Sequence, residues 1–170
     1  MQTLRLVEQR PRELMALLNR ALLDATDAAR RAQFTTLLLG ALSREPDGGL
    51  LVRVAGGGHP APLVVRTDGR TEPVRVGGMP VGALAAARFV EAEVRLAPGD
   101  LLVAYTDGVT RARGGPTRLE MFGEARLRQA LASGAGLPPA TLIDRLLRLV
   151  DDWLDGQVHD DIAMLAVAAE

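Results

Sequence analysis

The order of the apolar segments constrains the fold of this chain more than any other feature. One helix-like segment comes first, a series of short strand-like segments follows, and two helix-like segments precede a final strand-like one. Short strands joined by tight turns pair most simply as antiparallel neighbours. Helices outside such a series must bury their apolar faces against the sheet. The sequence therefore predicts an α+β fold in which helices cover a system of antiparallel sheets.

Three segments have helical periodicity. The first, 11–31, begins with Pro11, which suits the first turn of a helix. Its expected buried stripe consists of Leu14, Leu17, Leu18, Ala21, Leu22 and Ala25. The segments 119–133 and 138–154 have a similar spacing. In the second of these, the expected buried residues are Leu142, Ile143, Leu146, Leu149, Val150 and Trp153.

The predicted strands are 34–42, 50–58, 61–67, 70–76, 88–96, 100–106 and 161–169. The first of them is continuously apolar, which favours a buried strand. The Asp68-Gly69 turn predicts a hairpin between its two flanking strands.

Apolar and charged residues alternate along 88–96. The face expected to be buried carries Val90, Ala92, Val94 and Leu96. The turn 97–100 then predicts that 100–106 runs back antiparallel to this strand.

Composition excludes several classes of function. All 20 basic residues are arginine, and with 21 acidic residues the formal charge is −1, so no basic face for nucleic acid is expected. The chain has no cysteine, which excludes disulfides and thiolate chemistry and suits the cytoplasm. No apolar run is long enough to span a bilayer. Without lysine there is no Walker A motif, and no G-x-S-x-G motif indicates a serine hydrolase.

Two acidic features flank predicted core strands. Asp107 lies just beyond the strand 100–106, and Asp160 and Asp161 lie just before the apolar part of the last strand. If the two strands are antiparallel neighbours, the carboxylates converge at one sheet edge. Such a cluster must protonate, find cations or bind a metal. Oxygen ligands of this kind suit Mg²⁺ or Mn²⁺, and Gly108 would let the chain turn sharply beside them.

A purely structural interpretation stays open for each motif alone. Asp-Gly is a common turn dipeptide, and either aspartate of the second motif could simply close a loop. His159, next to Asp160, is a candidate for orienting a metal ligand by a hydrogen bond, or an ordinary loop histidine. Arg111 and Arg113 are candidates for contacting a phosphorylated partner, because guanidinium groups suit phosphate. Alternatively, the two arginines simply form a solvated flank of the motif.

Several motifs in this order resemble the PPM-type metal-dependent protein serine/threonine phosphatases, in their bacterial SpoIIE-like branch that includes sigma-factor regulators. The sequence segments that carry the resemblance are FTTLLLGAL, AGGGHPAPLVV, GGMPVGAL, LAPGDLLVAYTDGVTRAR, MFGEARL and HDDIAMLAV. Together they extend from about Pro11 to the end of the chain.

The resemblance implies an αββα sandwich of antiparallel sheets flanked by helices, with a two-metal site that uses Mn²⁺ or Mg²⁺. A metal-activated water then attacks phosphoserine or phosphothreonine without a nucleophilic side chain. By motif position, Asp107 and Asp160 are the expected metal ligands. Asp161 is expected to orient the loop or a metal-bound water.

The resemblance also exposes a gap. Family members carry, upstream of the matched region, a Gly-Asp motif and an Asp-x-Ser-Gly-His-Gly motif that supply further ligands, and neither is in this chain. We therefore expect a single SpoIIE-like domain over 1–170 that lacks the N-terminal part of the sandwich. The incomplete sheet edge is expected to favour a homodimer or strand swapping.

Two functions of different class follow. The first is hydrolysis of a phosphorylated regulatory protein, with an anti-sigma-factor antagonist as the natural substrate class of the family. The second is a catalytically inactive phosphatase-like module that binds a regulator in signal transduction. The missing upstream aspartates are the feature that separates the two.

Overall fold

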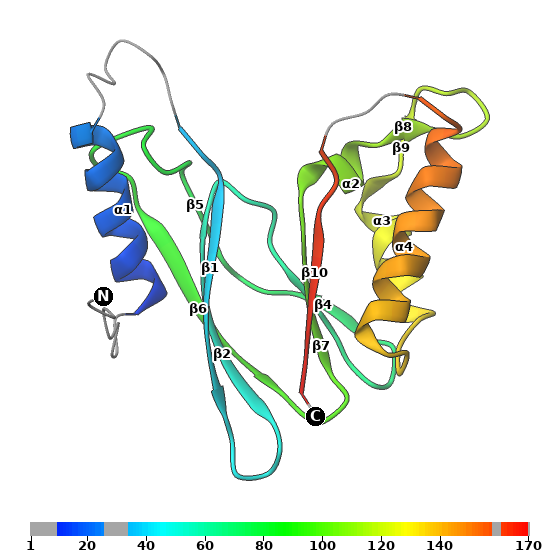
Figure 1. Ribbon diagram of the computed structural model, residues 1–170, viewed down its shortest axis with the longest axis horizontal. Helices are drawn as coiled ribbons and strands as arrows, with labels where there is room; N and C mark the ends of the chain where they lie inside the picture. Colours follow the sequence, from blue (N-terminus) through cyan, green and yellow to red (C-terminus); the bar gives the residue numbers. More distant parts are fainter. Residues whose placement is uncertain (1–9, 26–33, 158–160, 170) are drawn as a thin grey trace, which may run out of the picture. The chain divides into compact units, whose positions relative to one another are not determined.

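The computed structural model describes residues 10–25, 34–157 and 161–169, which divide into two compact units (Figure 1). Unit 1 comprises Met1–Ser43, Leu51–His59 and Arg75–Val94, and unit 2 comprises Arg44–Leu50, Pro60–Val74 and Arg95–Glu170. Each unit contains a four-stranded sheet with helical cover. The predicted α+β class is therefore confirmed. Among the described residues, no helix has the length and apolar character needed to cross a membrane.

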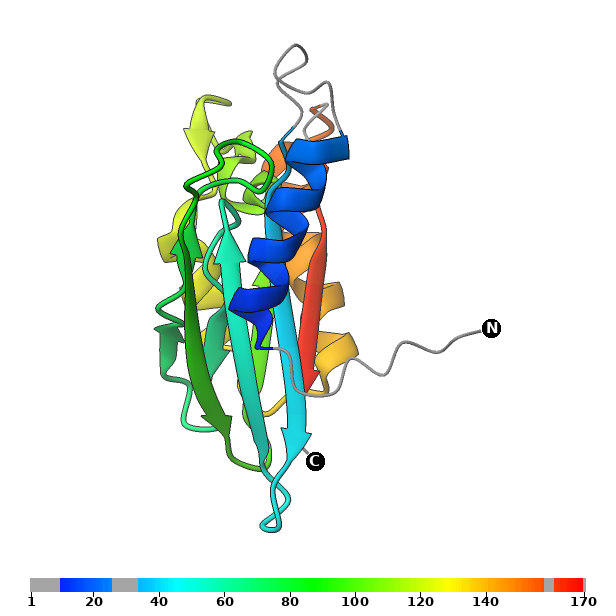
Figure 2. The same ribbon diagram turned by 90° about the vertical axis from the view of Figure 1, so that its left-hand side faces the viewer.

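The sheet of unit 1 has the strand order β1-β2-β6-β5. The strands are β1 Leu37–Arg44, β2 Leu50–Gly57, β6 Phe89–Leu96 and β5 Gly77–Gly78. Helix α1, Pro11–Ala25, lies across one face of this sheet (Figure 2). It begins at Pro11, as predicted. The close approach of α1 depends on Gly57, where a Cβ would lie 2.9 Å from the Met15 sulfur.

The buried stripe of α1 differs from the predicted one. Its fully buried residues are Pro11, Met15 and Asn19, whereas Leu17 and Leu22 are exposed. Met15 packs with Ala55, Val81 and Phe89 in a small core cluster. Asn19 is buried because its amide bonds the loop before β6: Nδ2 donates to the Leu84 oxygen at 3.0 Å, and Oδ1 accepts from the Gly82 N–H at 2.7 Å.

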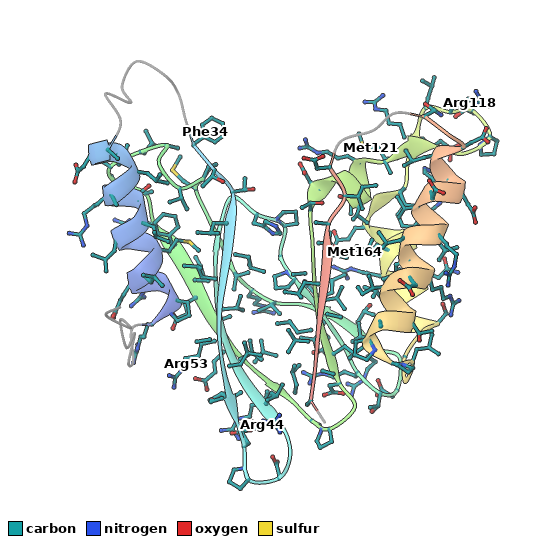
Figure 3. The ribbon with its side chains drawn as sticks, viewed as in Figure 1. Phe34, Arg44, Arg53, Arg118, Met121 and Met164 are labelled. Atoms are coloured by element: carbon teal, nitrogen blue, oxygen red, sulfur yellow. The ribbon has the colours of Figure 1, made fainter. Side chains whose placement is uncertain are left out.

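Strand β1 corrects the prediction of a buried strand at 34–42. It begins at Leu37, and its residues are exposed or only partly buried. The physical reason is its place at the edge of the sheet, where β2 is the one strand beside it in the described part of the chain. Leu42 is exposed, and Phe34, which precedes the strand, is exposed as well (Figure 3).

The predicted pairing of 100–106 with 88–96 is wrong. Strand β6 belongs to the first sheet, whereas β7, Leu101–Tyr105, belongs to the second. The turn 97–100 therefore leads from one sheet to the other. The predicted alternation in β6 holds only in part, because Leu96 is buried but Val90 is exposed and its neighbour Phe89 is buried instead.

The sheet of unit 2 has the order β10-β7-β3-β4. Its other strands are β10 Met164–Ala168, β3 Leu63–Val65 and β4 Thr71–Pro73. Strands β3 and β4 form the predicted antiparallel hairpin. Helices α3, Gly123–Ala132, and α4, Pro139–Leu154, cover one face of this sheet and complete the larger core (Figure 1). Along α4 the buried residues recur every four positions: Leu142, Leu146, Val150 and Leu154.

The remaining elements connect β7 to α3. They are the short helix α2, Asp107–Arg111, and the two-stranded ribbon of β8, Arg113–Gly114, and β9, Glu120–Met121. The loop of this ribbon carries Arg118, and β9 carries Met121 (Figure 3). Trp153 of α4 holds the ribbon, because its Nε1 donates to the main-chain oxygens of Ala112 and Glu120.

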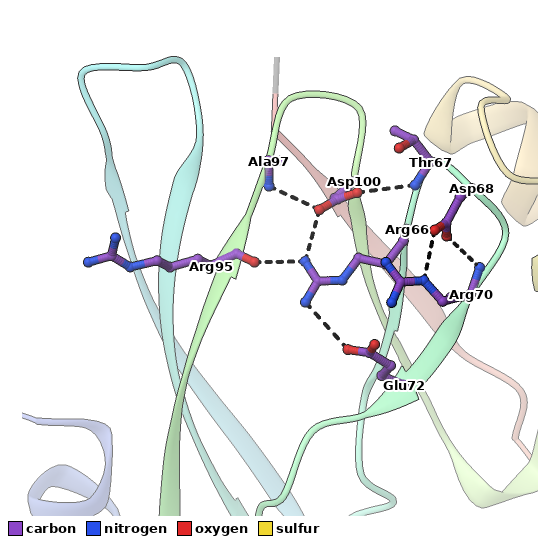
Figure 4. A network of polar contacts seen from close by, with 8 residues as sticks. All are labelled: Arg66, Thr67, Asp68, Arg70, Glu72, Arg95, Ala97 and Asp100. Atoms are coloured by element: carbon purple, nitrogen blue, oxygen red, sulfur yellow. Dashed lines mark hydrogen bonds and ion pairs between the residues drawn. The ribbon is translucent and has the colours of Figure 1, made fainter.

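A buried aspartate fixes the entry to β7 (Figure 4). Asp100 is only 4% exposed, and its carboxylate accepts hydrogen bonds from the Arg66 guanidinium at 2.9 Å and from the backbone N–H groups of Thr67 and Ala97. Arg66 Nη1 also donates to the Arg95 oxygen. A buried carboxylate is tolerated when it is paired and hydrogen-bonded in this way. The sequence predicted only a turn here.

Nearby, Asp68 and Arg70 form an exposed ion pair across the β3–β4 turn (Figure 4). The backbone and side-chain hydrogen bonds from Arg70 lower the pKa of Asp68. Both charges are already solvated by water, so the ion pair contributes little to the stability of the fold.

Candidate functional site

The pairing of β7 with β10 brings Asp107 and Asp161 to one sheet edge. The strands are antiparallel, and their register runs from Met164 opposite Tyr105 to Ala168 opposite Leu101. The end of β7 therefore lies beside the start of β10. This confirms the predicted neighbourhood of the two strands, and it places the segment after Tyr105 next to the segment before Met164.

Thr106 fastens these two segments together beyond the strand ends. Its Oγ1 donates to the Asp161 oxygen at 2.9 Å and accepts from the Ala163 N–H at 3.0 Å. The backbone N–H of Thr106 donates to the Ala163 oxygen at 3.0 Å. A hydroxyl can serve as donor and acceptor at once, which a valine of similar shape cannot. No role was predicted for Thr106 from the sequence, although it lies directly between a buried strand and Asp107.

Asp107 is the first residue of α2 and has a half-exposed carboxylate. Its Oδ2 lies 3.2 Å from Nη1 of Arg111, one helical turn away, and the two side chains are 47% and 69% exposed. An exposed pair of this spacing contributes well under about 1 kcal/mol. The arginine is thus a weak counterion that a more strongly bound cation would displace.

Gly108 does not form the sharp turn that was expected. It is buried in the first turn of α2, next to the fully buried Val109, and its φ is not in the left-handed region. The chain starts a helix here instead, with Asp107 in its first turn, where a negative charge is favourable. Helix α2 therefore gives Asp107 a fixed backbone rather than a hinge.

The two candidate arginines differ in position. Arg111 is held beside Asp107 by the ion pair just described. Arg113 lies in β8 and is exposed, and no ion pair involves it among the described residues. Of the two arginines, the structure therefore pairs only Arg111 with Asp107 among the described residues.

Two predicted site residues, His159 and Asp160, lie outside the described residues. Asp161 is described and exposed, and its main-chain oxygen accepts the Thr106 hydrogen bond. The roles of Asp107 and Asp160 as metal ligands, and of His159 and Asp161 in support, remain predictions.

The donor chemistry of this edge suits a hard divalent cation, since carboxylate oxygens are the ligands that Mg²⁺ and Mn²⁺ prefer. The ligand set is only partial, however. Within 10–25, 34–157 and 161–169, no group of three or more His, Asp or Glu side chains could hold a metal ion. The described residues thus fit one side of a metal site, with Asp107 as the carboxylate placed on a rigid element.

Among the described groups near this edge, Tyr105, the last residue of β7, has a shifted pKa. Burial of its phenol raises the pKa, the negative charge of Glu124 raises it further, and Arg128 opposes the change. The side chain belongs to the core of unit 2. Its shift therefore reflects packing of the strand end rather than acid-base chemistry.

Comparisons with known proteins identify the family. The family model described as Stage II sporulation protein E (SpoIIE) matches residues 1–170. Protein IcfG of Synechocystis sp. is 31% identical over 144 residues, which are 84% of this chain and 22% of that protein. The chain thus spans about a fifth of the length of this curated relative.

Solved structures agree with the fold. The phosphatase domain of the cell fate determinant SpoIIE from Bacillus subtilis, presoaked with Mn, matches with a TM-score of 0.64 at 16% identity, covering 98% of this chain and 74% of that one. PppA, a regulatory component of the type VI secretion system in Pseudomonas aeruginosa, matches with a TM-score of 0.65 at 17% identity, covering 94% and 72%. The chain has the fold of PP2C-type phosphatase domains, and it belongs to the SpoIIE family.

Proposed function

We propose that this chain is a protein serine/threonine phosphatase domain that acts on a phosphorylated regulatory protein. The observation that carries the proposal is the β7–β10 register, which sets the Asp107 and Asp161 segments side by side in a chain matched over its whole length by the SpoIIE model. The class of substrate comes from the family resemblance: a phosphoserine or phosphothreonine on an anti-sigma-factor antagonist. We infer a cytoplasmic location from the absence of cysteine.

Each residue of the edge has a distinct task in this proposal. Asp107, fixed by α2, contributes a carboxylate to Mn²⁺ or Mg²⁺, and Asp160 contributes a second one. Thr106 holds the two segments in register. Arg111, released from Asp107, is free to pair with phosphoryl oxygens. A bound divalent cation supplies charge neutralisation at the phosphoryl group and lowers the pKa of water.

The alternative is a catalytically inactive module that binds a regulator. Two observations favour it: the described residues hold no cluster of three metal-ligating side chains, and Asp107 already pairs with Arg111. A module of this kind would keep the scaffold and the partner-binding surface without turnover. A homodimer through the exposed edge of β1 or β10 is compatible with either function.

One experiment separates the two functions. Hydrolysis of p-nitrophenyl phosphate and of a phosphoserine-bearing regulator is measured with the 170-residue chain in the presence of Mn²⁺, together with Asp107→Asn and the control Asp151→Asn on the exposed side of α4. Turnover that is lost in Asp107→Asn and kept in Asp151→Asn supports the phosphatase. Binding of the phosphorylated regulator without turnover supports the module. If the protein shows no binding and no turnover, both functions are refuted.

A further inference from the structure

A groove between α3 and α4 in unit 2 is not used by the proposed function. It has a volume of about 430 Å³, which falls in the size range of protein ligand sites. Its apolar wall includes Phe122, Leu149 and Trp153. Leu149 was predicted to be buried in the core, but it is 37% exposed because it faces this groove. Ala130 of α3 also lines the groove.

Two arginines brace the groove. The guanidinium of Arg126 lies 4.1 Å from the centroid of the Trp153 ring and donates to the Met121 and Phe122 oxygens. Arg145 of α4 donates to the main-chain oxygen and the hydroxyl of Ser133. These contacts tie α4 to α3 and to the residues just before it. The groove is therefore preformed, which lowers the entropic cost of filling it.

The charge that remains open at the groove is negative. Of the two charged residues that line the groove, Arg126 is paired with the Glu120 carboxylate at 3.4 Å, whereas the carboxylate of Asp152 makes no hydrogen bond or ion pair among the described residues. The side chain of Gln129, on the α3 side, is likewise exposed and without a hydrogen bond there. An apolar floor with an open carboxylate is complementary to a bulky apolar group that carries a cation beside it.

We propose that this groove binds a basic segment of a partner protein, which inserts a bulky apolar side chain next to a lysine or arginine that pairs with Asp152. Grooves between helices receive such segments as amphipathic helices with anchors one turn apart. The proposal is independent of phosphate hydrolysis, because none of its residues lies at the β7–β10 edge.

Trp153 makes the test direct, since it is the only tryptophan in the chain and lines the groove. A probe peptide without tryptophan or tyrosine carries phenylalanine and leucine four residues apart, with lysines one turn from each. Matched peptides replace every lysine by glutamate or by glutamine. The emission of Trp153 is followed as each peptide is titrated into the 170-residue protein. We expect a saturable change with the lysine peptide alone.

Variants assign the binding to the groove. Asp152→Asn is expected to weaken binding of the lysine peptide about fivefold, because the ion pair that it removes is partly exposed. Leu149→Ser removes part of the apolar floor and is expected to weaken binding of the lysine peptide about tenfold. Asp151→Asn is the matched control, because Asp151 lines a different hollow of α4. Far-ultraviolet circular dichroism and thermal melting check that each variant is folded.

Three results would overturn the proposal. Equal binding of the glutamate or glutamine peptide would show that charge plays no part. Equal effects of Asp152→Asn and Asp151→Asn would place the peptide elsewhere. A change of Trp153 emission with protein concentration alone would identify a second copy of the chain as the occupant.

Discussion

The hydroxyl of Thr106 donates a hydrogen bond to the main-chain oxygen of Asp161, 55 residues further along the chain, over 2.9 Å. The same hydroxyl accepts the N–H of Ala163. One side chain thus continues the β7–β10 ladder past the point where both strands end. Thr106 thereby ties the segment that follows β7 to the segment that precedes β10.

Thr106→Val should destabilise the protein by about 1–3 kcal/mol, because it leaves the Ala163 N–H and the Asp161 oxygen without their partner at similar side-chain volume. Urea denaturation measures the change. Thr117→Val, in the β8–β9 loop, is the control: its hydroxyl accepts only an exposed, 3.4 Å hydrogen bond from the Leu119 N–H, so the midpoint should change little. If the two variants unfold at the same urea concentration, Thr106 does not fasten the edge.

Asp100→Asn should be more costly, at about 2–4 kcal/mol. The substitution removes the charge that pairs with Arg66 and replaces an acceptor oxygen by a donor that faces backbone N–H groups. The shift of the urea midpoint is compared with that of Asp68→Asn, which breaks only an exposed pair and should have almost no effect. Comparable midpoints for the two variants would contradict the proposed importance of burial at Asp100.

The sequence predicted the positions of the strands better than it predicted which strands lie side by side. The apolar runs located β7 and β10, and the convergence of the acidic motifs was expected on the condition that these strands are antiparallel neighbours, which the register shows them to be. The turn 97–100 was misassigned because a four-residue turn connects strands of one hairpin as readily as strands of two sheets. Its sequence does not contain the long-range partners of Asp100, which come from Arg66 and Thr67.

Burial was predicted least well. A continuous apolar run indicates a strand, but it does not reveal whether the strand is central or at an edge, and β1 is at an edge. In α1, the polar Asn19 is buried while the apolar Leu17 is exposed. The reason is the pair of hydrogen bonds from Asn19 to the loop 82–84, which depends on tertiary contacts that helical periodicity does not encode.

Gly115→Ala tests the seating of Trp153 against the β8–β9 ribbon. The backbone of Gly115 has φ +70°, and a Cβ there would lie 2.6 Å from the Trp153 ring. Gly136→Ala is a matched control with φ +80° and open space around the new methyl group. Both variants bear the strain of a left-handed residue, roughly 1 kcal/mol. Gly115→Ala should lose about 1–3 kcal/mol more in urea denaturation, from overpacking, and should also shift the emission of Trp153. Equal losses would mean that the ribbon yields to the methyl group.

Tyr105 should make the protein sensitive to alkali. Burial and the nearby charge of Glu124 raise its pKa above the ordinary value of 10.0, so the folded protein retains the phenol proton at a pH where the unfolded chain releases it. This contribution to stability is complete below about pH 10 and is lost as the pH rises through the folded pKa.

The chain has no lysine or cysteine and only one tyrosine, so no other side chain has an ordinary pKa near 10. The free energy of unfolding should therefore decline from pH 9.5 to 11.5 in the native protein and stay nearly constant in Tyr105→Phe, while tyrosinate absorbance reports the titration directly. Glu124→Gln should move that titration to lower pH, and a decline of the same size in Tyr105→Phe would contradict the assignment.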